Sequence, residues 1–162
     1  MAEELNILKY ASREEHYQNI IPQIQSLIKP EYDLIANMAN ISAVLKETFN
    51  FLWVGFYIVK GEELVLGPFQ GHIACTRIRY GKGVCGTAWK EERTMIVADV
   101  DTFAGHIACD SQSRSEIVIP VIKENKVIAV LDVDSEYKDH FSECDAKYLQ
   151  RIIELLTAQI LN

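Results

Sequence analysis

The sequence predicts an α+β fold in which a largely antiparallel sheet of about six strands carries helices from both chain ends. Apolar residues recur at helical intervals near both ends, whereas the middle consists of short β-branched and aromatic segments between turn residues. Residues 101–113 have no sustained periodicity and predict a long loop. We expect the helices on one face of the sheet, and the loops and a pocket on the other.

Two helices are expected before the sheet. Ser12 and Glu15 have the spacing of a capping box, and the apolar residues that follow at helical intervals predict a helix over 13–28. Pro22 falls inside this helix, where its missing backbone N–H predicts a kink or a division into two. A second apolar stripe over 34–45 predicts a helix that packs against the sheet.

The segment 51–59 begins the sheet, because it is aromatic and β-branched and too short for a typical helix. A short helix is expected over 84–91. Ser142 and Asp145 predict the start of a final amphipathic helix over 142–160. Further strands are expected at 63–69, 73–80, 95–100, 115–123 and 126–135.

Length and charge limit the partners of the protein. The chain has 162 residues, which fits one domain over 1–162, and its formal net charge of −7 repels the phosphate backbone of nucleic acids. No apolar run approaches the ~20 residues that span a bilayer, and the N-terminus lacks the basic-then-apolar order of a signal peptide. We therefore expect a cytoplasmic protein without nucleic-acid or membrane partners.

The four cysteines, Cys75, Cys85, Cys109 and Cys144, are the main candidates for chemistry. In the cytosol a cysteine is normally a thiol, which leaves catalysis, metal binding and core packing as alternatives. Cys109 lies in the long loop beside Asp110, where exposure and a charged neighbour alter thiolate reactivity. Cys85 follows a glycine by two positions and precedes another, so its backbone can approach a ligand closely. The place of Cys144 in the first turn of the last helix favours packing.

Three carboxyl groups and two aromatic residues are candidates for lining a pocket. Asp132 and Asp134 share one face of a strand because side chains alternate, and Glu116 lies at the start of the preceding strand. Carboxylates on one face raise each other's pKa, as a proton donor requires. Trp53 and Tyr57 also share a strand face. Solvated carboxylates and core aromatics have the same pattern, so these alternatives stay open.

Four segments of the chain resemble a known family. They are GPFQGHIACTRI, YGKGVCGTAW, HIACDSQSRSEIVIP and VLDVDS, and the likeness runs from about Trp53 to Phe141. These segments are similar to the signature segments of the free methionine-(R)-sulfoxide reductases, which are GAF domains. Cys75, Cys85 and Cys109 stand where that family has its cysteines.

The resemblance implies a thiol-dependent reaction on free methionine (R)-sulfoxide. Cys109 is expected to attack the sulfoxide sulfur, release methionine and become a sulfenic acid. Cys75, with Cys85 as the alternative, is expected to condense with it to a disulfide. Thioredoxin is the expected external reductant, and no cofactor is implied.

The resemblance also implies roles for the pocket residues. A sulfoxide is a poor electrophile until its oxygen is protonated, so Glu116, Asp132 and Asp134 are expected to supply an acid and anchor the substrate's ammonium. The two aromatic residues are expected to contact its methyl thioether end. Selection of the free amino acid requires a closed cavity that also binds a carboxylate, for which backbone N–H groups around Gly83–Gly86 and at Ile117 are candidates.

Two other functions are possible for such a sequence, a ligand-binding sensor domain and a zinc protein. A GAF domain without catalysis would bind a small molecule as a sensor, which normally requires an attached output domain that this length does not accommodate. A zinc site of the three cysteines with His72 or His106 lacks a ligand pair at the usual C-x2-4-C spacing, so we expect no metal. The helix over 142–160 is also a candidate for pairing two copies in a homodimer.

Overall fold

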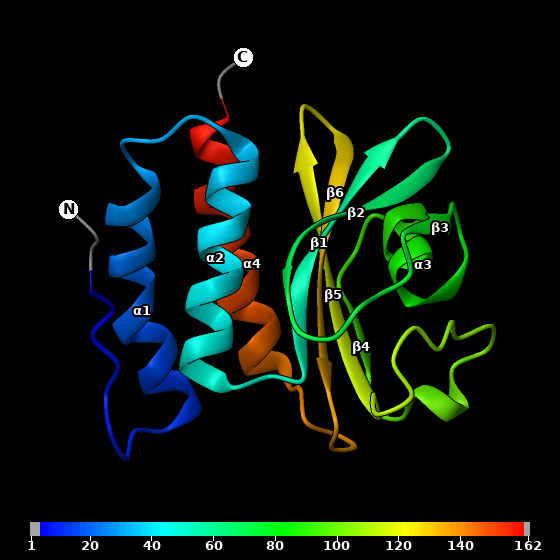
Figure 1. Cartoon of the computed structure of the whole chain (residues 1–162), viewed down its shortest axis with the longest axis horizontal. Coiled ribbons are helices and arrows are strands. Elements are labelled where there is room, and N and C mark those ends of the chain that lie inside the picture. Colours follow the sequence, from blue (N-terminus) through cyan, green and yellow to red (C-terminus); the bar gives the residue numbers. More distant parts are fainter. Residues whose placement is uncertain (1–3, 161–162) are drawn as a thin grey trace.

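The structure is a computed structural model that describes residues 4–160. Its centre is a six-stranded sheet in the order β3-β2-β1-β6-β5-β4, and every neighbouring pair of strands is antiparallel (Figure 1). This confirms the α+β fold and the antiparallel sheet. The strands are β1 Trp53–Lys60, β2 Glu63–Gln70, β3 Arg77–Arg79, β4 Met95–Val97, β5 Ser115–Lys123 and β6 Lys126–Ser135.

Two helices, α2 (Leu34–Phe49) and α4 (Glu143–Gln159), cover one face of the sheet, and α1 (Arg13–Ile28) packs on their outer side (Figure 1). Buried residues of all three helices form one core cluster with the sheet. The short helix α3 (Gly83–Glu91) and the long loop lie on the opposite face. Within residues 4–160, no helix combines the length and apolar character that a bilayer span requires.

Helix α1 begins as predicted and continues through its proline. Ser12 accepts a hydrogen bond from the backbone N–H of Glu15, whose side chain accepts one from the backbone N–H of Ser12 at 2.6 Å. This is the expected capping box. Pro22 does not divide the helix, so that alternative is wrong. The proline lies on the exposed face, while Ile20 and Ile24 are fully buried and hold the helix against the core.

Two strands are shorter than the sequence indicates. The strand expected over 73–80 is reduced to β3, and the strand expected over 95–100 is reduced to β4. The chain leaves the sheet at Gly71, whose φ is 142° and where an added Cβ would lie 2.6 Å from Trp53 Cδ1. Ile73 is then 91% exposed. Residues 73–76 therefore form a loop beside the sheet, and only β3 pairs with β2.

The alternation of side chains on the central strands separates the helix side from the pocket side. On β5, Ile117 and Ile119 belong to the core beneath the helices, whereas Glu116 faces the other way. On β6, Val133 belongs to that core and Asp132 faces the pocket. The predicted face for the carboxyl groups is therefore confirmed.

Candidate active site

A pocket lies between the sheet, α3 and two loops, and three adjacent strands form its floor. The register places Trp53 of β1 opposite Asp134 of β6, and Asp134 opposite Glu116 of β5. Side chains that face each other across adjacent antiparallel strands come into contact. All the predicted site residues line this pocket except Cys75, including Tyr57, Cys85, Cys109 and Asp132.

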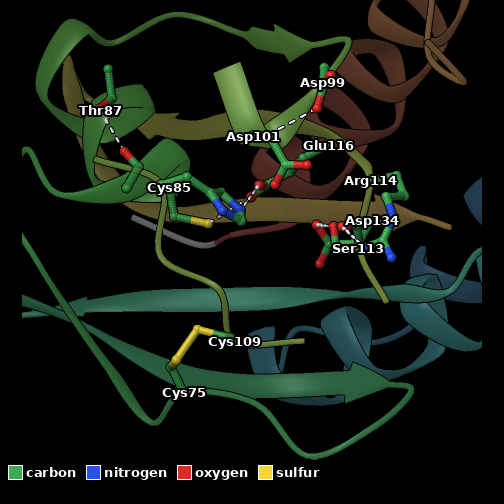
Figure 2. A network of polar contacts seen from close by, with 12 residues as sticks. Cys75, Cys85, Thr87, Asp99, Asp101, Cys109, Ser113, Arg114, Glu116 and Asp134 are labelled. Carbon is green, nitrogen blue, oxygen red and sulfur yellow. Dashed lines mark hydrogen bonds and ion pairs between the residues drawn. A yellow bond between two sulfur atoms is a disulfide. The ribbon is translucent and has the colours of Figure 1, made fainter. Parts of the chain in front are cut away.

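Cys75 reaches the site through a covalent bond, because its sulfur forms a disulfide with that of Cys109 (Figure 2). The two Cα atoms are 5.3 Å apart. The cysteines lie on separate loops, one between β2 and β3 and the other between β4 and β5. The pairing that the resemblance implied is present in the structure. The zinc set of three cysteines does not form here, since two of its sulfur atoms are bonded to each other.

Hydrogen bonds connect the Cys75 loop to the sheet, and a histidine–aspartate pair connects the two loops. Trp53 Nε1 donates to the backbone carbonyl of His72 at 3.1 Å, and the Tyr57 hydroxyl donates to that of Cys75 at 2.9 Å. Between the loops, His72 Nδ1 lies 2.9 Å from Asp110 Oδ2. These contacts were not predictable from the sequence, because no spacing pattern links the two loops.

The three carboxyl groups have raised pKa values, and burial is the main cause. Glu116 and Asp132 are each 6% exposed. Burial, and then the neighbouring Asp134, raises the pKa of Glu116 to about 8. Burial also raises the pKa of Asp132 and of Asp134 well above the usual range, and a neighbouring carboxyl adds to each shift. Mutual repulsion, the cause expected from the sequence, is therefore the smaller contribution.

Cys85 lies in the first turn of α3 as a free, buried thiol. Its Sγ is 3.9 Å from Oε1 of Glu116, and Figure 2 shows the sulfur apart from the disulfide. Burial, and then the neighbouring Asp132, raises the pKa of this thiol well above its usual range. A neutral thiol is a poor nucleophile, so this environment does not favour attack by Cys85.

The long loop contributes two further polar groups. His106 Nε2 lies 3.7 Å from Glu116 Oε2, and burial lowers the pKa of this imidazole, which favours its neutral form. Ser113 Oγ donates to Asp134 Oδ1 at 3.3 Å. From the sequence, His106 was a candidate only as a metal ligand and Ser113 was not a candidate, because an aperiodic loop does not indicate which side chains turn inward.

The start of α3 borders the pocket through Gly83, Val84 and Cys85. The first backbone N–H groups of a helix have no acceptor within it, and no side chain caps this helix. Such groups suit an anionic ligand, for example a carboxylate. The structure does not support Ile117 as a second backbone donor, since it lies between β4 and β6 with its side chain in the helix-side core.

The pocket is nearly closed in this disulfide-bonded state. Its free space is about 30 Å³ for the centres of water-sized molecules. That volume holds about two water molecules. A free amino acid is larger than this free space.

Known proteins resemble the chain over nearly its whole length. The GAF domain family matches residues 33–160. GAF domain-containing protein A of Dictyostelium discoideum is 60% identical over 157 residues, which cover 96% of this chain and 99% of that protein. Free methionine-R-sulfoxide reductase of Escherichia coli is 42% identical over 146 residues, which cover 90% of this chain and 88% of that protein. The X-ray structure of free methionine-R-sulfoxide reductase from Neisseria meningitidis in complex with its substrate has a TM-score of 0.94 at 47% identity, covering 96% of this chain and 94% of that chain.

The antiparallel sheet and its helices are those of a GAF domain. Two of these three proteins are named free methionine-R-sulfoxide reductases, and their likeness extends well beyond the pocket. The chain belongs to the free methionine-R-sulfoxide reductase family of GAF domains. The resemblance carried by the four sequence segments is thereby confirmed.

Proposed function

We propose that this protein reduces free methionine (R)-sulfoxide to methionine, with Cys109 as the nucleophile and Cys75 as the resolving thiol. The observation that carries the proposal is the Cys75–Cys109 disulfide beside three buried carboxyl groups. A disulfide is the product that remains when two thiols supply two electrons. The names of the similar proteins from E. coli and N. meningitidis support this substrate.

The reaction balances in two steps. The Cys109 thiolate attacks the sulfoxide sulfur while the sulfoxide oxygen takes a proton. The oxygen is then transferred from the methionine sulfur to the Cys109 sulfur, so that the S–O bond of the sulfoxide breaks, methionine leaves and Cys109 becomes a sulfenic acid. The Cys75 thiol displaces the hydroxyl of this sulfenic acid, which leaves as water as the S–S bond forms. An external dithiol, in our proposal thioredoxin, reduces the disulfide by exchange and restores both thiols.

The carboxyl groups divide into a proton donor and an ammonium site. Glu116 is the donor to the sulfoxide oxygen, because a pKa of about 8 keeps it protonated at neutral pH. Asp132 and Asp134 bind the substrate's ammonium, and a cation beside them lowers their pKa and lets them ionise. Trp53 and Tyr57, whose ring centroids are 5.9 Å apart, form an apolar wall for the methyl thioether.

The substrate binds to the reduced protein, because the Cys109 sulfur has to be free of the disulfide before it can attack the sulfoxide. The first backbone N–H groups of α3 bind its carboxylate. A methionine inside a peptide has neither a free ammonium nor a free carboxylate. These two binding sites therefore account for selection of the free amino acid.

The test is methionine formation from the separate R and S sulfoxides, each free and N-acetylated, with thioredoxin or dithiothreitol as the reductant. We expect turnover of the free R form alone. The N-acetylated R form is the matched control, because it keeps the sulfoxide and removes the ammonium. No turnover of any form would contradict the proposal and leave a small-molecule-binding domain.

A further inference from the structure

Cys85, Glu116 and Asp132 form a compact cluster of metal-ligand atoms in the pocket. One ligand atom from each lies within 4.8 Å of the others, and all three residues are buried. They belong to α3, β5 and β6, so three separate elements fix their relative positions. A sulfur and two carboxylate oxygens at such separations suit a small cation of borderline softness such as Zn²⁺.

One oxygen of this cluster lacks a partner. Oδ1 of Asp132 is buried and makes no hydrogen bond with the described residues. An unpaired buried acceptor destabilises the folded protein, so a cation that coordinates it removes this penalty. Among the described residues that line the pocket, none is Lys or Arg. Either a proton on each carboxyl group or a bound cation therefore has to neutralise this cluster.

We propose that Zn²⁺ binds to Cys85, Glu116 and Asp132, with its fourth position open to water. The thiolate and two carboxylates carry three negative charges, of which the cation neutralises two. All three groups release their protons on binding, so zinc affinity rises with pH. This set differs from the zinc site considered from the sequence, because it uses neither Cys75 nor Cys109.

Zinc bound here inhibits the reductase. In the proposed function, Asp132 binds the substrate's ammonium and Glu116 donates the proton. Bound zinc would occupy both carboxyl groups. Zinc and methionine sulfoxide therefore exclude one another, an effect that rests on the proposed function. Zinc binding itself does not depend on that function, because it follows from the ligand geometry alone.

The test uses Co²⁺ as a probe, because a cobalt–thiolate bond has a near-ultraviolet absorption band. The full chain carrying Cys75→Ser and Cys109→Ser has no disulfide and no other thiol in the pocket. We expect this double variant to give the band and Zn²⁺ to displace it. Adding Cys85→Ser should abolish the band and lower the affinity for zinc at least about 100-fold. Even residues that only hydrogen-bond to metal ligands contribute ~10–100-fold to metal affinity. Cys144→Ser is the matched control and should leave the cobalt band and the zinc affinity unchanged.

The carboxylates are tested in the same double variant. Glu116→Gln and Asp132→Asn should each lower the affinity for zinc at least about tenfold. Asp134→Asn, on the same face of β6 but outside the cluster, should change the affinity by a smaller factor, and circular dichroism checks folding throughout. A missing cobalt band, or a band that survives Cys85→Ser, overturns the proposal. So does zinc binding that is lost in the double variant. None of these readouts measures turnover, so a failed reductase assay leaves them unaffected.

Discussion

The hydroxyl of Tyr57 donates a hydrogen bond of 2.9 Å to the backbone carbonyl of Cys75, and so connects the central sheet to the loop of the proposed resolving thiol. Tyr57 belongs to β1 and is 2% exposed. Trp53, from the same strand face, donates to the carbonyl of His72 in that loop at 3.1 Å. The two aromatic residues therefore position the Cys75 loop through hydrogen bonds and also line the pocket.

Tyr57→Phe keeps the ring and removes the hydrogen bond to Cys75. A hydrogen bond of this kind contributes about 1 kcal/mol, so the Cys75–Cys109 disulfide should become about fivefold easier to reduce. The measurement is the dithiol–disulfide equilibrium against glutathione, followed by mass spectrometry after alkylation. Tyr80→Phe, at a half-exposed tyrosine, is the control. Equal equilibria for wild type and Tyr57→Phe would show that the bond does not position Cys75.

Glu116→Gln removes the proposed proton donor with little change in shape. Turnover should fall by about 10²–10⁴-fold, the range that positioned acids contribute. Since the donor acts in its protonated form, wild-type activity should decline as pH rises through the pKa of about 8. The residual activity of the variant should lack this decline, and the pH profile of kcat/KM, which reports the protein without bound substrate, measures both effects. Glu124→Gln, in the turn between β5 and β6, controls for loss of charge elsewhere.

The same carboxyl makes stability depend on pH. Its pKa rises from a reference of 4.5 to about 8 in the folded protein, so the folded state holds the proton more tightly. This contribution to stability is complete below about pH 4.5 and is lost as pH rises from there through about 8. Glu116→Gln should therefore raise the melting temperature at pH 9 relative to wild type and change it little at pH 5. A similar change at both pH values would show that Glu116 titrates in the folded protein as it does in water.

Much of the fold was predictable because local patterns determine it. The helix expected over 13–28 has the bounds of α1, and the strands expected over 115–123 and 126–135 have those of β5 and β6. The failures lie where tertiary structure overrides the pattern. The segment 73–80 has strand-forming residues, but the turn at Gly71 takes most of it off the sheet edge.

The site was predictable to the extent that it depends on strand alternation. Alternation placed Asp132 and Asp134 on one face, and the hairpin brought Glu116 to the same side. The disulfide joins residues separated by 34 positions, and only the resemblance to a family indicated that pairing. The Tyr57–Cys75 hydrogen bond depends on the path of a loop, which composition does not determine.

Cys75→Ser should stop the reaction after the first step. Methionine should form once per protein molecule, and Cys109 should accumulate as a sulfenic acid that a cyclic diketone such as dimedone traps. Mass spectrometry of the labelled peptide and the size of the methionine burst measure this outcome. Cys85→Ser is the matched control and should still form the Cys75–Cys109 disulfide. Trapping in Cys85→Ser but not in Cys75→Ser would reassign the resolving role to Cys85.

Gly55→Ala should destabilise the sheet beneath the pocket. Gly55 lies between Trp53 and Tyr57 on β1, where the pairing with β2 shifts register. A Cβ added there would lie 2.3 Å from Cβ and 2.7 Å from Cα of Phe69, so backbone has to move. We expect a loss of about 3 kcal/mol in the free energy of unfolding, the upper end for overpacking. Denaturant unfolding of the reduced protein measures it.

Gly61→Ala separates this clash from the general cost of replacing a glycine. Gly61 has a φ of 64°, and an added Cβ meets nothing within 4 Å, so the expected loss is only about 1 kcal/mol of backbone strain. Gly55→Ala should also lower turnover in the folded fraction, because a shifted β1 moves both aromatic residues and the Cys75 loop that they hold. Equal losses of stability for the two variants would mean that β1 and β2 separate at little cost, and that the pocket floor is not rigid at Gly55.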